Sequence, residues 1–332
     1  MYKNIVGVDE LFKWKKELPS YVYISLTNSC NANCVFCDVH ENKLKTNKLN
    51  IYKLIDEIAD MGAKYIHFMG GGEPFTDPLI EDYIKYISQK GLYVACTTNG
   101  LLLSADRIQR LKDCNLSHMF ISIDGAKKEI HDKLRRVDGI FENAVNAINR
   151  LKEMNKDIVI VINHVINKQN IDSIDEMIML KETVKFDYLN LLLVKDCPEL
   201  EVSDEQREKY LQNIDKYRMM AKKIGVKFFE EDINVFQSRC VGQDISCYFP
   251  YYATYVDCPT GKVYPCDCTI HRSEDYCYGN LFENSFTELW NGEKLKDLRS
   301  KLINEKMLCK TFCDSVNIST NIEWAQNKSL KS

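Results

Sequence analysis

The sequence lacks any long apolar segment and any large excess of charge of one sign, and these absences exclude several classes of protein. No apolar run approaches the roughly 20 residues that a membrane-spanning helix needs. The first residues, from Met1 to Val6, lack the apolar core of a signal peptide. The net charge is only −4, so no general attraction to nucleic acids or anionic membranes is expected. We therefore expect a cytoplasmic protein that has neither a nucleic acid nor a membrane as a partner.

The sequence also shows no internal repeat and no low-complexity segment, so repeat architectures are not indicated. Hydrophobic residues make up 45% of the chain and charged residues 28%, which is the balance of a folded globular protein. A length of 332 residues is enough for one large domain or two ordinary ones.

Cysteine, in contrast, is abundant, with 14 residues in the chain. Disulfides are disfavoured in the cytoplasm, so metal binding or redox chemistry is the better explanation for so many thiols.

Three of these cysteines, Cys30, Cys34 and Cys37, follow directly after the apolar, β-prone run Tyr21–Thr27. Three thiolates can hold three irons of a [4Fe–4S] cluster and leave the fourth iron open to a substrate or cofactor. Ferredoxins close this position with a fourth cysteine, whereas the next cysteine here, Cys96, is far away in the sequence. The alternative is a zinc site, but such sites usually have four ligands in paired Cys-x2-Cys units.

A second motif, Gly-Gly-Glu-Pro, follows the β-prone run Tyr65–Met69. Glycine carries no Cβ and lets a backbone approach a ligand closely. With the cysteine triplet, this motif resembles the radical S-adenosylmethionine (SAM) enzymes. The resemblance implies that Gly71 and Gly72 approach the methionine part of SAM and that the Glu73 carboxylate binds its amino group.

Six apolar, β-prone runs alternate with segments of helical periodicity. They are Tyr21–Thr27, Tyr65–Met69, Tyr93–Thr97, His118–Asp124, Asp157–Ile166 and Asp187–Val194. Such alternation predicts an α/β fold with parallel strands and crossover helices. It matches the partial (β/α)6 TIM-like barrel of the radical SAM core, whose functional residues lie at the C-terminal ends of the strands.

The chain divides, on this pattern, into an N-terminal arm (1–20), a radical SAM core (21–196), a linking helix and strand (197–239) and a small C-terminal α+β iron–sulfur domain (240–332). A capping box at Ser203–Gln206 predicts a long charged helix to about Lys223. Gly225–Phe229 is a candidate short strand.

The resemblance also implies further contacts to SAM along the barrel. The residues concerned are Phe36, Asn99, Ser122, Asp124, Arg135, Asn163 and Leu192. Arg135 suits the SAM carboxylate because its planar fork binds carboxylates at two points, although Arg136 competes for this role. The Thr-Asn-Gly and Ile-Asp-Gly segments are also ordinary turns at strand ends. His67 is expected to be a packing residue rather than a ligand.

The C-terminal region contains a third motif, in which Gly261 lies between Cys247 and Cys266. This spacing resembles the start of the SPASM or twitch extension of radical SAM enzymes. The chain lacks the Cys-x2-Cys that full SPASM domains carry shortly before the position of Cys309. The resemblance therefore implies one auxiliary [4Fe–4S] cluster, held by Cys247, Cys266, Cys309 and Cys313 and suited to electron transfer.

Seven cysteines remain, and they have more than one explanation. Cys240, Cys258, Cys268 and Cys277 are spare thiols, alternative ligands or ligands of a second auxiliary cluster. Cys258 and Cys268 flank Gly261 and are candidate hydrogen-atom donors. Cys96, Cys114 and Cys197 are expected to be small, buried, apolar residues.

The resemblance implies reductive cleavage of SAM to methionine and a 5′-deoxyadenosyl radical, which removes a hydrogen atom from a substrate carbon. The protein positions the cofactors that carry this chemistry. Transfer of an electron to the auxiliary cluster gives oxidation or cross-linking, and return of hydrogen from a cysteine gives epimerisation. A flavodoxin- or ferredoxin-type protein is the expected electron donor.

The substrate is less well defined by the sequence. About twenty residues precede the first strand, so we expect no fused peptide-recognition domain. Size and a single auxiliary cluster resemble a radical SAM enzyme that dehydrogenates an aminocyclitol, which favours a small polyol, sugar or nucleoside-like substrate. The alternative is a maturase of ribosomally synthesised peptides. A non-catalytic iron–sulfur carrier is a second alternative, which the complete set of SAM-contact motifs disfavours.

Overall fold

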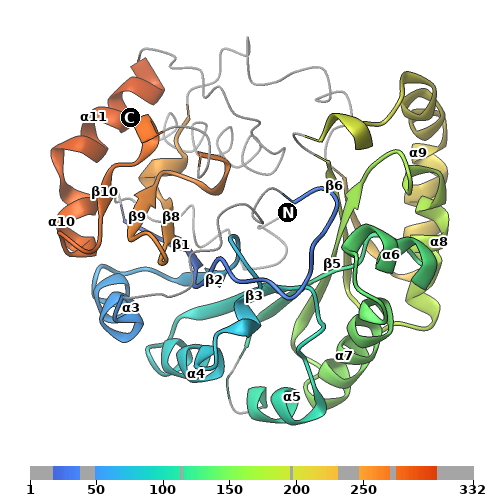
Figure 1. Ribbon diagram of the computed structural model, residues 1–332, viewed down its shortest axis with the longest axis horizontal. Coiled ribbons are helices and arrows are strands. Elements are labelled where there is room, and N and C mark those ends of the chain that lie inside the picture. Colours follow the sequence, from blue (N-terminus) through green and yellow to red (C-terminus); the bar gives the residue numbers. More distant parts are fainter. Residues whose placement is uncertain are drawn as a thin grey trace.

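The computed structural model describes residues 18–37, 49–112, 114, 116–194, 197–230, 247–269 and 274–304, with the backbone alone at 228–230, 268 and 304. Within them, one ten-stranded sheet has the order β10-β9-β8-β1-β2-β3-β4-β5-β6-β7. In Figure 1 this sheet forms an open arc with the helices on its outer side. The predicted α/β fold with a partial TIM-like barrel is therefore confirmed.

The six predicted strands all form, each within one or two residues of the expected run. They are β1 (Tyr21–Ser25), β2 (Tyr65–Phe68), β3 (Tyr93–Thr98), β4 (His118–Ser122), β5 (Val159–Ile166) and β6 (Tyr188–Leu193). Each pairs with the next in parallel, and β7 (Lys227–Glu230) pairs in parallel with β6. All the C-terminal ends of these strands consequently lie at one edge of the sheet.

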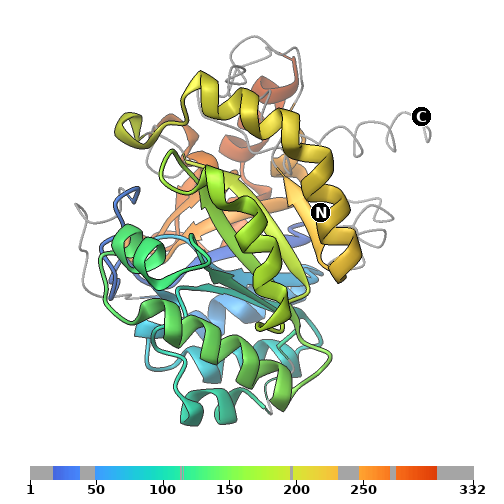
Figure 2. The same ribbon diagram turned by 90° about the vertical axis from the view of Figure 1, so that its right-hand side faces the viewer.

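The helices that connect these strands cover the outer face of the arc. They are α3 (Ile51–Asp60), α4 (Ile80–Gln89), α5 (Ala105–Leu111), α6 (Lys128–Arg135), α7 (Ile140–Met154), α8 (Ile174–Met179) and α9 (Asp204–Ile224). The capping box predicted at Ser203 is present, with Gln206 as its partner, and starts α9. Figure 2 shows this long helix beside α8 at the β7 end of the sheet.

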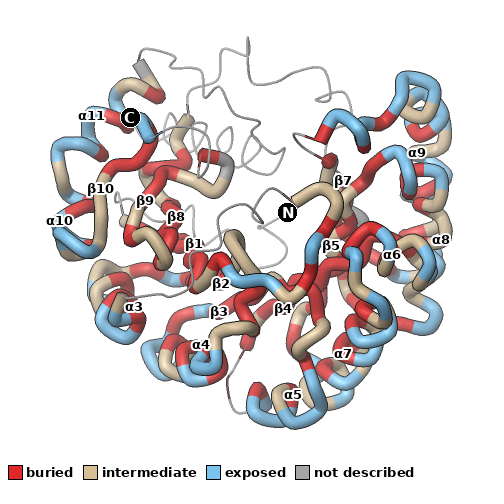
Figure 3. Tube along the Cα trace, in the orientation of Figure 1, coloured by how far each residue is buried: buried red, intermediate tan, exposed pale blue. Residues whose placement is uncertain are grey.

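The main core lies between the strands and these helices. Strand residues that face outward, such as Ile24, Ile66, Ile121 and Ile162, are fully buried. Each such side chain contributes about 1.5–3 kcal/mol through burial. Figure 3 shows buried residues along the strands and exposed residues on the outer sides of the helices.

Aromatic and polar side chains fill the inner face near the N-terminal ends of the strands. Tyr21 stacks on Tyr65 with ring centroids 4.5 Å apart, and its hydroxyl is 2.9 Å from Nδ1 of His67. The other ring nitrogen of His67 is 2.8 Å from Oγ1 of Thr97. Burial lowers the pKa of His67 to about 3, so this histidine is neutral. His67 therefore packs inside the barrel, as predicted.

The C-terminal region continues the same sheet. Strand β8 (Ala253–Asp257) pairs in parallel with β1, and the antiparallel strands β9 (Lys262–Tyr264) and β10 (Gly279–Asn280) extend it. The helices α10 (Phe286–Asn291) and α11 (Glu293–Asn304) follow. The backbone N–H of Phe286 donates to Glu57 on α3 at 2.6 Å. The position proposed for the start of the iron–sulfur domain, residue 240, lies outside the described residues.

Short 3-10 turns complete the described elements. They are η2 (Pro74–Thr76), η3 (Ile171–Ser173), η4 (Leu180–Glu182), η5 (Pro198–Leu200), η7 (Phe249–Tyr251), η8 (Asp267–Thr269) and η9 (Glu274–Tyr276). Among the helices described, none is both long enough and apolar enough to cross a membrane.

Candidate functional site

The cysteine loop, residues 26–37, leaves the C-terminal end of β1 and is held by the turn that follows β2. The N–H of Gly72 donates to the carbonyl of Thr27 at 2.6 Å, and the N–H of Glu73 donates to the carbonyl of Ser29 at 2.8 Å. The two motifs that the sequence singled out are thus in direct backbone contact.

The glycines of this turn are required by that contact. A Cβ on Gly72 would lie 1.9 Å from the carbonyl oxygen of Ser29, and one on Gly71 would lie 2.2 Å from Oγ of Ser25. Gly71 also has a positive φ of 51°, which disfavours other residues. The expectation was that the glycines make room for a ligand. In the described structure the cysteine loop occupies the space that their side chains would need, and their contact with SAM stays a prediction.

The far half of the loop is held by the C-terminal end of α6 and by β3. The N–H of Val35 donates to the carbonyl of Leu134 at 2.9 Å. Nδ2 of Asn99, at the end of β3, donates to Oδ1 of Asn31 at 2.8 Å. Asn99 therefore joins the strand end to the cysteine loop, which places this predicted site residue beside the cysteines.

The three cysteines of the loop differ in exposure: Cys30 is exposed, Cys37 half-buried and Cys34 buried. Although Cys30 as a residue is exposed, partial desolvation of its sulfur raises the pKa of the thiol, and the backbone N–H of Ala32 opposes that rise. Burial also raises the pKa of Cys34, against the effect of the Arg135 cation, whose Nη1 lies 3.5 Å from Cys34 Sγ. Positive charge and N–H donors next to sulfur favour the thiolate, which is the form that binds iron.

Arg135 is oriented by a buried carboxylate. Its Nε and Nη2 atoms both lie 2.6 Å from Oδ2 of Asp124, which is fully buried. The ring of Phe36 lies against the guanidinium, with its centroid 5.3 Å from Cζ. Arg136 is exposed and has the left-handed φ of 53° that ends α6. Of the two arginines, it is Arg135 that faces the cysteine loop.

Asp124 is itself anchored by its neighbours. Its Oδ1 accepts the N–H of Val165 at 2.8 Å, and its own N–H donates to Nδ1 of His131 at 2.9 Å. Burial lowers the pKa of His131 to about 4, so the ring is a neutral acceptor. No described contact tests the predicted role of Asp124 in binding SAM, so that role stays a prediction.

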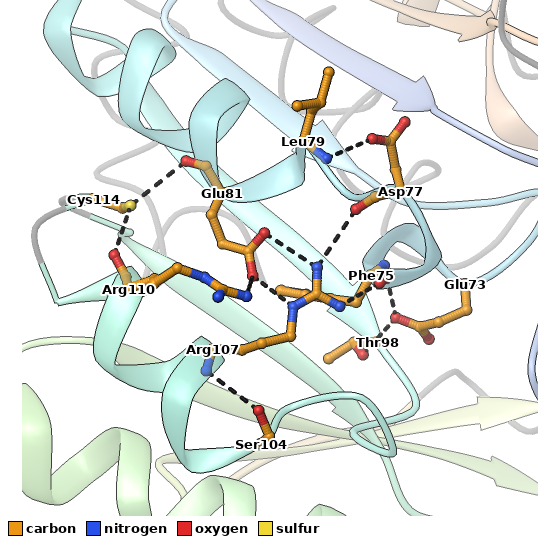
Figure 4. Close-up of polar contacts among 10 residues, drawn as sticks. All are labelled: Glu73, Phe75, Asp77, Leu79, Glu81, Thr98, Ser104, Arg107, Arg110 and Cys114. Carbon is orange, nitrogen blue, oxygen red and sulfur yellow. Dashed lines mark hydrogen bonds and ion pairs between the residues drawn. The ribbon is translucent and has the colours of Figure 1, made fainter.

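Glu73 is a second buried carboxylate, and it joins the turn after β2 to the C-terminal end of β3 (Figure 4). Its Oε1 accepts hydrogen bonds from the N–H of Phe75 at 3.1 Å and from Oγ1 of Thr98 at 2.7 Å. Its Oε2 accepts the N–H of Asn99 at 2.8 Å. Burial raises the pKa of Glu73, and these hydrogen bonds oppose the rise. A buried carboxylate of this kind is suited to a cationic partner, such as an amino group.

Arg107 of α5 supports this arrangement, and it is a functional residue that sequence motifs do not reveal. Its Nη1 donates to the carbonyl of Phe75 at 2.5 Å, and its guanidinium lies over the Phe75 ring. The same group binds Glu81 of α4 at 2.6 and 3.1 Å. Figure 4 shows the arginine between the two helices and the turn that carries Glu73. No motif marks Arg107, because its partners lie 26 or more residues away.

Three site residues, two of them predicted, form a polar row on the inner face, at the C-terminal end of β4 and in the middle of β5 and β6. Ser122 of β4 is in register with Asn163 of β5, which is in register with Asn190 of β6. Nδ2 of Asn190 donates to Oδ1 of Asn163 at 2.9 Å. Leu192 lies two residues further along β6, so it is on the same face. No sequence motif marks Asn190, although the two-residue period of β6 places it with Leu192.

Family models match two regions of the chain. The model of the radical SAM superfamily matches residues 24–180, and that of SPASM, an iron–sulfur cluster-binding domain, matches residues 247–314. The chain belongs to the radical SAM superfamily. It carries a SPASM-type domain at its C-terminus, and its cofactors are SAM, a [4Fe–4S] cluster and auxiliary iron–sulfur clusters.

Several curated proteins are similar to this radical SAM protein. The AdoMet-dependent heme synthase of Methanosarcina barkeri is 28% identical over 314 residues, covering 85% of this chain and 85% of its own. The mycofactocin maturase MftC of Mycolicibacterium smegmatis is 26% identical, covering 87% and 75%. The PqqA peptide cyclase of Bradyrhizobium diazoefficiens is 25% identical, covering 54% and 47%.

Among solved structures, Streptococcus suis SuiB has the same fold as this radical SAM protein. The TM-score is 0.70 at 16% identity, covering 92% of this chain and 76% of SuiB. SuiB has also been crystallised with S-adenosylmethionine and with its precursor peptide SuiA.

The cysteine loop of this radical SAM protein supplies three thiols, whereas zinc sites usually have four ligands. The thiolates of a four-iron cluster each bind a different iron, so three of them leave one iron without a protein ligand. Cys30, Cys34 and Cys37 would hold the cluster, with the Arg135 and Ala32 donors beside the sulfurs.

The auxiliary-cluster cysteines are only partly within the described residues. Cys247 and Cys266 are both half-buried and pack against the main core. The N–H of Cys247 donates to the carbonyl of Leu302 on α11 at 3.2 Å. Cys240, Cys309 and Cys313 lie outside the described residues, so the proposed ligand set stays a prediction.

The remaining thiols are mostly buried. Cys96, Cys114 and Cys197 are buried, as predicted. Cys258 is fully buried in the main core, which raises the pKa of its thiol well above the ordinary value. A substrate would have to reach this thiol through packed side chains. For Cys268 only the backbone is described, and the role of both residues as hydrogen donors stays a prediction.

Proposed function

We propose that this protein is a radical SAM maturase that modifies a carbon atom of a peptide substrate. The observation that carries the proposal is its similarity, across both the core and the SPASM region, to a protein named as a maturase. A named peptide cyclase and a structure with a bound precursor peptide support the same substrate class. The expected polyol, sugar or nucleoside-like substrate has less support than this alternative.

The bound cofactors supply a one-electron cleavage of SAM that produces an organic radical able to remove hydrogen from carbon. The protein orients and shields the reactants. In this proposal, Glu73 presents its buried carboxylate to the amino group of SAM. Gly72 and Asn99 hold the cysteine loop beside Glu73. A flavodoxin- or ferredoxin-type donor provides the electron. Oxidation, cross-linking and epimerisation remain open as outcomes of the reaction.

The polar row on the inner face of β4, β5 and β6 supports a peptide rather than a charged substrate. Ser122, Asn163 and Asn190 are neutral, and the two amides lie side by side with a 2.9 Å hydrogen bond between them. The hydrogen bond between them leaves the N–H groups of Asn163 and the amide oxygen of Asn190. These groups can pair with the C=O and the N–H of a peptide bond. Such a neutral donor and acceptor set is suited to an uncharged backbone.

A tetrapyrrole is the second candidate substrate, because the similarity to the heme synthase extends over 85% of both chains. Tetrapyrroles with acid side chains need cationic partners, and the side chains of the polar row supply none. Arg135, the cation nearest to the cysteine loop in the described structure, is paired with Asp124.

The test is an anaerobic assay of the reconstituted protein with SAM and a reductant. One series contains the short peptides encoded beside its gene, and another contains an iron porphyrin with carboxylate side chains. We expect 5′-deoxyadenosine release to depend on one of the peptides and that peptide to change mass or take up deuterium from D2O. The matched control is the Cys30/Cys34/Cys37→Ala variant, which should release none.

If the porphyrin is modified and every peptide is unaltered, the substrate is a tetrapyrrole and not a peptide. Absence of SAM cleavage in all series, with the iron content complete, would favour the non-catalytic carrier.

A further inference from the structure

We propose that Arg135, held in place by Asp124, donates a hydrogen bond to the Cys34 sulfur and sets the reduction potential of the radical SAM cluster. In this role it is a positioning residue of the cluster and not the ligand of the SAM carboxylate that the family resemblance implies. The inference rests on membership of the radical SAM superfamily and is independent of the substrate.

The nitrogen atoms of the Arg135 side chain are all directed at protein partners. Nε and Nη2 lie 2.6 Å from one carboxylate oxygen of Asp124, and Nη1 lies 3.5 Å from Cys34 Sγ. Only 8% of Arg135 is exposed, and Phe36 covers one face of the guanidinium. Few N–H groups of the guanidinium therefore remain for a second carboxylate, such as that of SAM.

The backbone joins this arginine to the cysteine loop as one unit. The carbonyl of Arg135 accepts the N–H of Asn33 at 3.3 Å, and the carbonyl of Leu134 accepts the N–H of Val35 at 2.9 Å. These two bonds flank Cys34 on both sides in the sequence. The end of α6 thus fixes the loop and the direction from which Arg135 approaches the sulfur.

Asp124 does not depend on Arg135 for its position. Its Oδ1 accepts the N–H of Val165, its N–H donates to His131, and its carbonyl accepts Nδ2 of Asn170 at 2.9 Å. The carboxylate should therefore stay in place when Arg135 is replaced. The Arg135 cation contacts the Cys34 sulfur, and the Asp124 anion contacts the same guanidinium through its other nitrogens. Both groups are held in place by the fold.

Charge and hydrogen bonds at the ligand sulfurs tune the potentials of iron–sulfur clusters. A donor and a positive charge at Cys34 stabilise the reduced cluster, which carries the additional electron, and so raise the potential. The buried carboxylate of Asp124 acts in the opposite direction. Loss of Arg135 should therefore lower the potential, and loss of the Asp124 charge should raise it.

The experiment measures the midpoint potential in an anaerobic titration monitored by electron paramagnetic resonance. The signal of the radical SAM cluster is the one that changes when SAM is added. The variants are Arg135→Gln, Arg135→Lys and Asp124→Asn, with Arg136→Gln as the matched control because Arg136 is exposed. Iron content and SAM affinity are measured on each protein.

We expect Arg135→Gln to shift the reduction equilibrium at least tenfold toward the oxidised cluster, which is about 59 mV for one electron. Asp124→Asn should shift it toward the reduced cluster. Arg135→Lys keeps the charge and should lie between the wild type and the Gln variant, while Arg136→Gln should match the wild type. SAM affinity should change less than twofold in Arg135→Lys.

An unchanged potential in Arg135→Gln together with a tenfold loss of SAM affinity would overturn the proposal and make Arg135 a ligand of the SAM carboxylate. Shifts of the same sign in Arg135→Gln and Asp124→Asn would also overturn it. If the Arg135→Gln variant fails to assemble its cluster, the midpoint potential of the Asp124→Asn variant becomes the test. An unchanged potential in Asp124→Asn would contradict the proposal. None of these measurements involves a substrate, so they are independent of the peptide hypothesis.

Discussion

Arg107 of α5 and Glu81 of α4 form a two-point ion pair, with nitrogen–oxygen distances of 2.6 and 3.1 Å, behind the turn that carries Glu73. The side chains are 15% and 8% exposed, so the pair is largely shielded from water. The arginine also binds the carbonyl of Phe75, whose N–H in turn binds Glu73. Two helices outside the sheet therefore fix the position of a carboxylate at the candidate SAM site.

Arg107→Met should destabilise the protein and weaken the binding of SAM. Removing one partner of a buried ion pair costs up to about 3–5 kcal/mol, and the cost should fall below that limit here because Glu81 keeps its longer contact with Arg110. Urea unfolding measures the first effect and calorimetric titration with SAM the second. Arg110→Met is the control, since Arg110 is 60% exposed and contacts Glu81 only at 3.5 Å. Equal effects of the two substitutions would show that the pair does not position Glu73.

Gly72→Ala should prevent assembly of the radical SAM cluster. Its Cβ would lie 1.9 Å from a backbone oxygen of Ser29, so the turn and the cysteine loop must separate. The control is Gly91→Ala, where a Cβ meets nothing within 4 Å but φ is +77°, so only strain of about 1–2 kcal/mol is added. We expect the iron content to fall in Gly72→Ala and to stay complete in Gly91→Ala. A full iron complement in Gly72→Ala would contradict the close packing of the two motifs.

Acid should destabilise the fold through His67. The pKa of this group is about 3 in the folded protein and 6.5 when unperturbed, so stability is fully present above pH 6.5 and is lost as the pH falls toward 3. One proton corresponds to about 1.4 kcal/mol per pH unit. In His67→Gln, the slope of unfolding free energy against pH between about 4 and 5.5 should decrease by nearly one proton.

Tyr21→Phe is the control for His67, because it removes a hydrogen bond to the ring and leaves the titrating group in place. It should lower the stability without altering the slope. The same slope in His67→Gln and in the wild type would mean that His67 is not the group that titrates.

Iron analysis under anaerobic conditions should separate the two cluster regions. With one radical SAM cluster and one auxiliary cluster, we expect about eight irons per chain, falling to about four in the Cys30/Cys34/Cys37→Ala variant. A fall from about four irons per chain to none would show that the chain holds no auxiliary cluster. About eight irons left in the variant would show two auxiliary clusters and make the proposed four-cysteine ligand set wrong.

Local features of the sequence were sufficient to predict the fold and the position of its active edge. The apolar, β-prone runs of β1 to β6 and the period of about 3.6 in the helices depend only on near neighbours, so they are visible without the structure. The cysteine triplet and the Gly-Gly-Glu-Pro segment are likewise short and contiguous. They led to the radical SAM family, its cofactors and a SPASM-type domain, all of which the family models confirm.

The contacts between segments far apart in the chain, in contrast, are visible only in the folded protein. The glycines of the turn pack against the cysteine loop, Arg107 supports Glu73 from behind, and Asn190 joins Asn163 across two strands. Arg135 approaches Cys34, 101 residues away, because α6 ends beside the loop. The partners in these contacts are chosen by the packing of whole helices and strands. Sequence periodicity defines each element and its buried face, but not the side chain of another element that this face will meet.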